Sequence, residues 1–226
     1  MNSKTIVITG ATGVLGNLVA KTFAERGHNI ALLDRDQIKL DSLVRDLNLP
    51  NERLYAQTID LLNGTAVHDS AEAVLSKFGS VHALIHLVGG WTGGKTIPES
   101  SEDDFESMLN QHVWTTFHLL HAFAPQIAKS NWGRVMIVSK PETVHPSAKT
   151  ALYTAAKSAQ ESLVLTLAEE YKENGLTANV IHVKSIDTKN EALRGATTPA
   201  EIVSAMTYLF SDDAGKVNGA RIPLYG

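Results

Sequence analysis

The chain has 226 residues, of which 43% are hydrophobic and 19% are charged, and its formal net charge is −4 at pH 7. This balance is ordinary for one globular domain with a substantial core, and it argues against nucleic acid or an anionic membrane as a partner. Because the chain has no cysteine, disulfides, thiolate catalysis and Cys-ligated metals are excluded. The first residues lack the apolar region of a signal peptide and no apolar run is long enough to span a bilayer, so we expect a cytoplasmic protein.

Short apolar runs alternate with amphipathic stretches along the whole chain, which is typical of a doubly wound parallel sheet. Strands are predicted near 4–9, 29–33, 53–59, 81–88, 133–139, 176–183 and 219–225. Helices are predicted near 14–26, 36–47, 64–78, 101–128, 149–173 and 199–210. We find no repeat or linker, so the pattern predicts an α/β fold: a single Rossmann-type domain over 1–226 with about seven parallel strands and helices on both faces.

Three glycines follow the first predicted strand. Gly10, Gly13 and Gly16 have the spacing G-x-x-G-x-x-G and lead into a helix, an arrangement that permits a tight turn and lets backbone N–H groups approach a pyrophosphate. The second predicted strand ends in Asp34, eighteen residues after Gly16, where a dinucleotide fold places a carboxylate on the adenosine ribose hydroxyls. The succession of strand, loop, helix, strand and acid favours a dinucleotide site over a purely structural turn.

A second glycine-rich segment and the histidines bear on the kind of site. Residues 89–94 read Gly-Gly-Trp-Thr-Gly-Gly and follow the fourth predicted strand, whose carboxyl end is where such sheets bind ligands. The nine histidines include His82 with His86 and His118 with His121, but no Asp, Glu or Cys joins either pair in a ligand pattern. The sequence therefore predicts a loop that lines a site and no metal centre.

Tyr153 and Lys157 are the strongest candidates for chemistry. They lie four residues apart in a predicted helix and therefore on one face of it. A neighbouring cation stabilises a phenolate, so we expect Lys157 to lower the pKa of Tyr153 toward the working range of an acid or base. The alternative is an ordinary polar pair on a solvated face. The same helix carries an apolar face that is consistent with pairing between chains, formed by Leu152, Ala156, Ala159, Leu163 and Leu167.

Over nearly its whole length the chain resembles the short-chain dehydrogenase/reductase family. The matching pieces are the segment Thr9-Gly10-Ala11-Thr12-Gly13-Val14-Leu15-Gly16, Asp34, Asp60-Leu61, Tyr153 with Lys157, and Ile186-Asp187-Thr188. The resemblance implies that Tyr153 donates or accepts the proton and that Lys157 holds the nicotinamide ribose. It also implies a cofactor site formed by Gly10, Thr12, Gly13, Val14, Leu15, Gly16, Asp34, Arg35, Asp60, Leu61, Val88, Gly89, Gly90, Tyr153, Lys157, Ile186 and Thr188.

The chain departs from the family pattern at four places. His86-Leu87-Val88 precedes Gly89 where the family has Asn-Asn-Ala, and Val183-Lys184 replaces the usual Pro-Gly. His112 stands at the position of the relay asparagine, and Lys140, with Ser139 one step earlier, stands at that of the catalytic serine. Lys140 could donate a hydrogen bond to the substrate in place of the serine, or it could point into solvent.

Within the family, several of these departures resemble the dihydropteridine reductases, which also lack the serine but keep the tyrosine and lysine. The Gly-Gly-Trp-x-Gly-Gly match is the most specific part of this resemblance. An electron-poor quinonoid ring accepts hydride without much carbonyl polarisation, and Trp91 or Trp114 could stack on such a ring. The alternative for both tryptophans is core or interface packing. Gly195 to Pro199, at the place of the family's substrate lid, is short enough to suggest a small substrate or an open pocket.

The favoured interpretation is an NAD(P)-dependent reductase of a small carbonyl compound or quinonoid pterin, with Tyr153, Lys157 and Lys140 as catalytic residues. NAD(H) should be preferred because Asp34 repels a 2′-phosphate, although the adjacent Arg35 leaves NADP(H) possible. Two alternatives remain: a dinucleotide-binding protein that has lost catalysis, and a scaffold that keeps the fold for its partners. We expect a homodimer or homotetramer.

Overall fold

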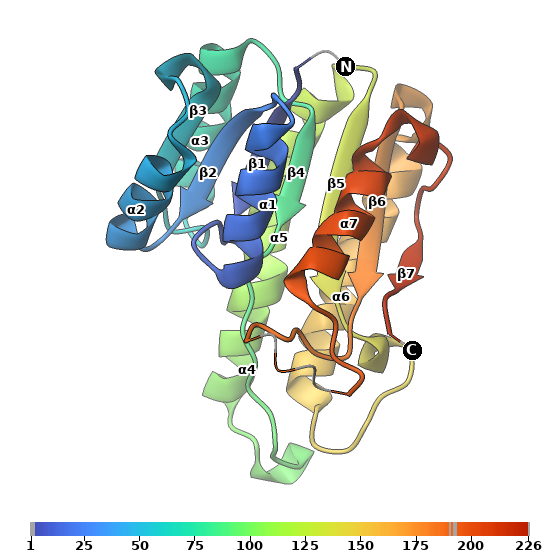
Figure 1. Ribbon diagram of the computed structural model, residues 1–226. Helices are drawn as coiled ribbons and strands as arrows, with labels where there is room; N and C mark the ends of the chain where they lie inside the picture. The colour runs from blue at the N-terminus through green and yellow to red at the C-terminus, as the bar shows by residue number, and fades with distance from the viewer. Residues whose placement is uncertain (1–2, 190, 192–193, 226) are drawn as a thin grey trace.

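The computed structural model describes residues 3–189, 191 and 194–225. Within these ranges seven parallel strands form one sheet in the order β3-β2-β1-β4-β5-β6-β7 (Figure 1). The strands are β1 Thr5–Thr9, β2 Asn29–Asp34, β3 Leu54–Thr58, β4 Ala83–His86, β5 Gly133–Ser139, β6 Leu176–His182 and β7 Arg221–Pro223. The predicted doubly wound sheet is confirmed, although β4 and β7 are shorter than the sequence suggested.

Helices cover both faces of the sheet (Figure 1). The described helices are α1 Val14–Glu25, α2 Gln37–Leu47, α3 Gly64–Phe78, α4 Glu102–Leu109, α5 Thr115–Ala128, α6 Ala151–Glu170 and α7 Pro199–Phe210. One core cluster joins the sheet to α1, α2 and α7, and the other joins it to α3, α5 and α6. Among the described residues, no helix is long and apolar enough to cross a membrane.

Burial explains the strand pattern. All five residues of β1 and all seven of β6 are buried. β1 is therefore a continuous apolar or β-branched run rather than an alternating one, whereas β6 also contains the buried polar residues Asn179 and His182. The edge strand β7 pairs only with β6 and is mostly exposed, which explains why it ends after three residues.

One helix prediction needs correction. The single helix expected near 101–128 is interrupted by a π-helical turn, η3, at Asn110–Trp114, between α4 and α5. A π turn places one more residue in each turn than an α-helix, and such turns occur frequently at functional sites. It rotates the side chains that follow it, which matters for the site below.

The apolar face expected to pair α6 with a second chain is largely used within the chain. Ala156 and Leu167 are buried, and Leu163 packs against the core cluster that α6 shares with α3 and α5. Leu152 packs beside Ala156 and Tyr153 in a smaller cluster. This face therefore gives no support to the expected oligomer.

Candidate active site

A cleft opens at the carboxyl edge of the sheet, where β1 and β4 lie side by side. The chain proceeds from β1 to β2 on one side and resumes at β4 on the other, so this is the topological switch point of the sheet. Two cavities of about 530 Å³ and 410 Å³ meet here, and both are lined by Gly10, Gly13, Leu87, Val88 and Gly89. The shared lining makes them two compartments of one elongated cleft.

The smaller compartment surrounds Asp34 at the end of β2. The Asp34 carboxylate accepts hydrogen bonds from the backbone N–H groups of Thr12, at 2.9 Å, and Arg35, at 2.8 Å. These bonds fix an anion against the glycine loop. Thr12, Arg35, Asp60 and Leu61 line the same compartment, as the sequence predicted for an adenosine site.

The glycine loop brings backbone close to the cleft. Gly10 has φ +66°, and a Cβ added to it would lie 3.0 Å from the backbone of Leu87 and Val88. A Cβ on Gly16 would lie only 2.2 Å from the carbonyl oxygen of Gly10. No side chain caps α1 at Gly13, so its first N–H groups lack the partner that a capping side chain supplies. The loop and helix end are suited to a phosphate group.

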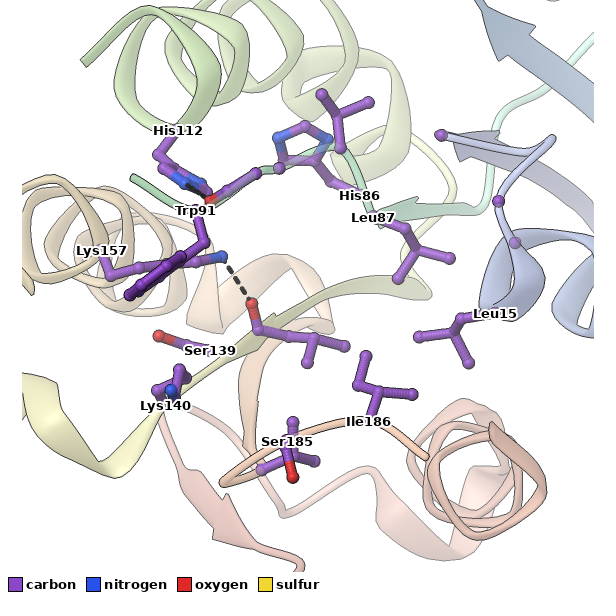
Figure 2. Close-up of a pocket in the computed structure, with 18 of the residues that line it drawn as sticks. Leu15, His86, Leu87, Trp91, His112, Ser139, Lys140, Lys157, Ser185 and Ile186 are labelled. Carbon is purple, nitrogen blue, oxygen red and sulfur yellow. Dashed lines mark hydrogen bonds between the residues drawn. The ribbon is translucent and has the colours of Figure 1, made fainter. Parts of the chain in front are cut away.

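Tyr153 and Lys157 lie in the wall of the larger compartment, and both are buried. The Lys157 Nζ donates to the carbonyl oxygen of Val138 at 2.9 Å and to Oε1 of Gln160 at 2.8 Å; Figure 2 shows the first of these bonds as a dashed line. Burial lowers the pKa of Lys157 to about 8, although the Glu161 carboxylate on the next turn opposes this shift.

The expected lowering of the Tyr153 pKa is wrong. The physical reason is that burial raises the pKa of Tyr153 well above its ordinary value, and the carboxylates of Glu142 and Glu161 add to the rise. The hydrogen bonds of Lys157 go to Val138 and Gln160 rather than to the phenol. Tyr153 is therefore a protonated phenol over the neutral pH range, as a proton donor needs to be.

Lys140 lies on the pocket side of the end of β5. Its side chain lines the larger compartment together with Ser139, and its Nζ is 5.8 Å from the centre of the Tyr153 ring (Figure 2). Glu142 lies 3.4 Å from the same Nζ. The structure thus favours the pocket over solvent as the place of Lys140, and it pairs this lysine with a carboxylate that the sequence did not suggest.

Two buried histidines replace asparagines of the family pattern. His112 Nε2 is 2.9 Å from the carbonyl oxygen of Gly90 and must donate to it, while its ring meets that of Tyr153 edge-on at 5.4 Å. His86 Nδ1 is 2.6 Å from Oγ1 of Thr9, which ties β4 to β1. Burial lowers the pKa of each imidazole to about 3, so both are neutral. They hold the loop and the sheet together rather than supply charge.

The two tryptophans have different positions. Trp91 lines the larger compartment, and its indole covers Gly93, where an added Cβ would lie 2.6 Å from the ring (Figure 2). Trp114 lines neither compartment, so its position gives no support to the substrate-binding role, which stays a prediction. It lies on the outer side of the π turn against Phe117 and His118, because His112 takes the inward side.

Every residue predicted for the cofactor lines the cleft, from Asp34 at one end to Thr188 at the other. Sequence reasoning missed Gln160 and Thr116, whose side chains hydrogen-bond near Lys157. The available signal was a glutamine three positions after Lys157 and thus on its side of the helix. The described residues contain no group of three or more His, Asp or Glu side chains that could hold a metal ion.

This fold, with a Gly-rich loop at the switch point and a Tyr-x-x-x-Lys pair in the cleft, is that of a short-chain dehydrogenase. Residues 4–198 match the family model described as short chain dehydrogenase, and the chain belongs to that family. Similar curated proteins are oxidoreductases. They include the (2S)-[(R)-hydroxy(phenyl)methyl]succinyl-CoA dehydrogenase subunit BbsC of Thauera aromatica and the meso-2,3-butanediol dehydrogenase of Serratia marcescens, each 27% identical over 100% of this chain and 94% of the relative.

Solved structures support the same fold. A short-chain type dehydrogenase/reductase from Mycobacterium ulcerans superposes with a TM-score of 0.90 at 20% identity, covering 98% of this chain and 88% of that one. A short chain oxidoreductase from Pseudomonas aeruginosa PAO1, described as containing an atypical catalytic center, has a TM-score of 0.87 at 20% identity over 97% and 95%. An NAD+-bound xylitol dehydrogenase has a TM-score of 0.87 at 22% identity over 99% and 98%.

Proposed function

We propose that this protein is an NAD(P)-dependent reductase in which Tyr153 gives a proton to a small substrate while hydride arrives from the nicotinamide. The observation that carries the proposal is the layout of one cleft. Asp34 and the glycine loop line one end, and Tyr153 with Lys157 lines the other. A dinucleotide bound in an extended form needs its two ends to meet sites at the two ends of one cleft.

The residues present fit that cofactor. Asp34 would accept hydrogen bonds from the ribose hydroxyls of the adenosine. Gly10 and Gly16 would let the loop pack closely enough to present its backbone N–H groups to the pyrophosphate, since a Cβ at either position would meet neighbouring backbone. Lys157 would hold the second ribose, with Ile186 and Thr188 beside the carboxamide. When bound, the cofactor supplies the hydride; the protein supplies position and the proton.

The protonation state of Tyr153 fits the proton-donor role that the proposed reduction assigns to it. A phenol with a raised pKa holds its proton until negative charge develops on the substrate oxygen or nitrogen, and it then donates that proton. We propose that Lys140 donates a hydrogen bond to the same atom in place of the missing serine. Its place on the pocket wall beside the Tyr153 ring supports this role.

The substrate is proposed to be a small carbonyl compound or a quinonoid pterin. Trp91, half exposed on the pocket wall, offers a flat face to a planar ring. The GGWTGG segment and the absent serine support the pterin, which needs less polarisation than a ketone. Asp34 supports a preference for NAD(H), and Arg35, in the same compartment, leaves NADP(H) able to bind.

The test is turnover of the purified protein with NADH and NADPH against a panel of quinonoid dihydropterin and small aldehydes, ketones and diketones, followed by loss of nicotinamide absorbance. The proposal expects turnover of at least one acceptor. Tight cofactor binding without turnover of any acceptor would favour the alternative of a dinucleotide-binding protein without catalysis. Sedimentation of the same sample tests the proposed homodimer or homotetramer.

A further inference from the structure

A chain of hydrogen bonds runs from Lys157 into the interior of the protein. Lys157 Nζ donates to Oε1 of Gln160 at 2.8 Å, Gln160 Nε2 donates to Oγ1 of Thr116 at 2.8 Å, and Thr116 Oγ1 donates to the carbonyl oxygen of His112 at 2.6 Å. Gln160 and Thr116 are each 1% exposed. Polar side chains this deeply buried are costly unless every partner is in place.

The chain ends in the helical segment that contains the π turn. Thr115 and Thr116 follow the turn directly, and their hydroxyls donate to the carbonyl oxygens of Gln111 and His112, one turn back. The single proton of the Thr116 hydroxyl is thereby used, so its oxygen can only accept from Gln160. The Gln160 amide donates to Thr116 with its nitrogen, which turns its oxygen toward Lys157. Each donor in the chain therefore has a fixed direction.

We infer that Gln160, held by Thr116, is a positioning residue for Lys157. Together with the Val138 carbonyl it engages two of the three ammonium N–H groups and leaves the third for a group bound in the cleft that Lys157 lines. This inference rests on the proposed function, in which Lys157 acts on the cofactor. The anchor of the chain consists of the His112 carbonyl, in the π turn, and the Thr116 hydroxyl, in the first turn of α5.

The chain does not conduct protons. It passes through a carboxamide and ends at a backbone carbonyl, neither of which gains and loses protons at ordinary pH. The proton that Tyr153 gives to substrate must therefore be replaced from the cleft side. The hydrogen bonds on the interior side restrict the position of the Lys157 side chain.

The charged and titratable groups around Lys157 set the background for any test. Glu161 on the next turn of α6 raises the pKa of Lys157, and burial lowers it more strongly. The other groups are neutral or already paired: Tyr153 on α6, His86 on β4, His112 on the π turn, Lys140 with Glu142 after β5, and His182 on β6, which is 2.9 Å from Glu161. None of them is altered by substitution of Gln160 or Thr116.

The experiment measures the Lys157 titration directly by NMR of protein carrying ¹³C-labelled lysine, with Lys157→Met to assign the signal. Gln160→Leu removes the acceptor, and Gln160→Glu replaces it with an anion. Thr116→Val removes the anchor with almost no change of shape, and Thr116→Ser keeps the hydroxyl. Thr177→Val in β6, whose buried hydroxyl has no hydrogen-bond partner among the described residues, serves as the control.

The two Gln160 substitutions should shift the Lys157 pKa in opposite directions. Gln160→Leu lowers the pKa of Lys157 by about one unit and Gln160→Glu raises it by a similar amount, because an ammonium loses or gains a partner for its charge. The alkaline limb of the kcat profile moves with it, kcat at pH 8 falls about fivefold in Gln160→Leu, and cofactor affinity changes less. Thr116→Val should shift the Lys157 pKa in the same direction as Gln160→Leu. In Thr116→Ser and Thr177→Val the Lys157 pKa should match that of the wild type.

An unchanged Lys157 titration in both Thr116→Val and Gln160→Leu, with the thermal midpoint alone lowered, would overturn the inference and leave Gln160 as a packing residue. If Gln160→Leu fails to fold, the comparison of Thr116→Val with Thr116→Ser tests the inference, again through the NMR titration of Lys157. A wild-type protein without turnover on any acceptor would contradict the proposed function, whereas the lysine titration would still decide the role of Gln160.

Discussion

Replacing Gly16 with alanine tests whether the glycine loop is built for close packing beneath a phosphate. The added Cβ would lie 2.2 Å from the Gly10 carbonyl oxygen and 2.8 Å from the Ala11 Cα, both of them backbone atoms. At Gly13, by contrast, the nearest atom would lie at an ordinary 3.4 Å. The helix α1 must therefore move about 1 Å away from the end of β1, because neither backbone can give way as a flexible side chain would.

The size of the effect follows from this displacement. Overpacking of this kind costs about 1–3 kcal/mol, which lowers the thermal midpoint by roughly 2–4 °C per kcal/mol in a chain of this length. The same movement takes the first N–H groups of α1 away from the phosphate site, so we expect cofactor affinity to fall at least tenfold, or about 1.4 kcal/mol. Gly13→Ala should keep the thermal midpoint near that of the wild type.

The assay is a thermal unfolding scan of both variants, together with a fluorescence titration with NADH at fixed ionic strength. If Gly16→Ala unfolds at the wild-type temperature and binds NADH with wild-type affinity, the contact between Gly16 and Gly10 does not organise a phosphate site and the reasoning fails.

Three further predictions follow from the site. The wild type should bind NADH about tenfold more tightly than NADPH, because the Asp34 carboxylate repels the 2′-phosphate, and Asp34→Ala should remove the difference; equal affinities in the wild type would contradict this. Lys140→Ala should lower turnover by ~10- to 1000-fold because the substrate loses a charged hydrogen-bond donor, whereas Lys172→Ala, just beyond the C-terminal end of α6, should leave turnover unchanged. If Lys140→Ala leaves turnover unchanged, Tyr153 and Lys157 work without it. Because hydrogen bonds from His182 and Arg221 hold the pKa of Glu161 near 2, below its ordinary 4.5, this carboxylate should contribute stability above pH 4.5 that is lost as the pH falls toward 2. Denaturant unfolding from pH 6 to pH 2 measures this loss, and a Glu161→Gln protein with the same pH dependence as the wild type would count against it.

Much of the fold could be predicted because its signals are local. The spacing of Gly10, Gly13 and Gly16, the acid at the end of β2, and the continuous apolar runs of fully buried parallel strands each determine a structure over a few residues. These signals place the glycine loop and Asp34 at the cleft. The other residues predicted for the cofactor, which line the cleft as well, were implied by the resemblance to the family.

The sequence failed to predict the features of the site that depend on the direction in which a side chain points. Trp114 and His112 are two residues apart in the same predicted helix and therefore point different ways, and the sequence did not show that the histidine is the one that faces the cleft. The spacing of Tyr153 and Lys157 was sufficient to place both in the cleft, but it did not show that the ammonium is directed to Val138 and Gln160. The pKa of Tyr153 depends on that direction and on burial, and neither can be read from spacing.

The most direct test of the proposed chemistry is the turnover of Tyr153→Phe with NADH and the best acceptor found for the wild type. This change deletes one hydroxyl in the cleft wall and little packing, so the variant should bind NADH within about twofold of the wild type while its turnover falls at least about 100-fold. Wild-type turnover in Tyr153→Phe would mean that the proton comes from another group, and the central claim would be wrong.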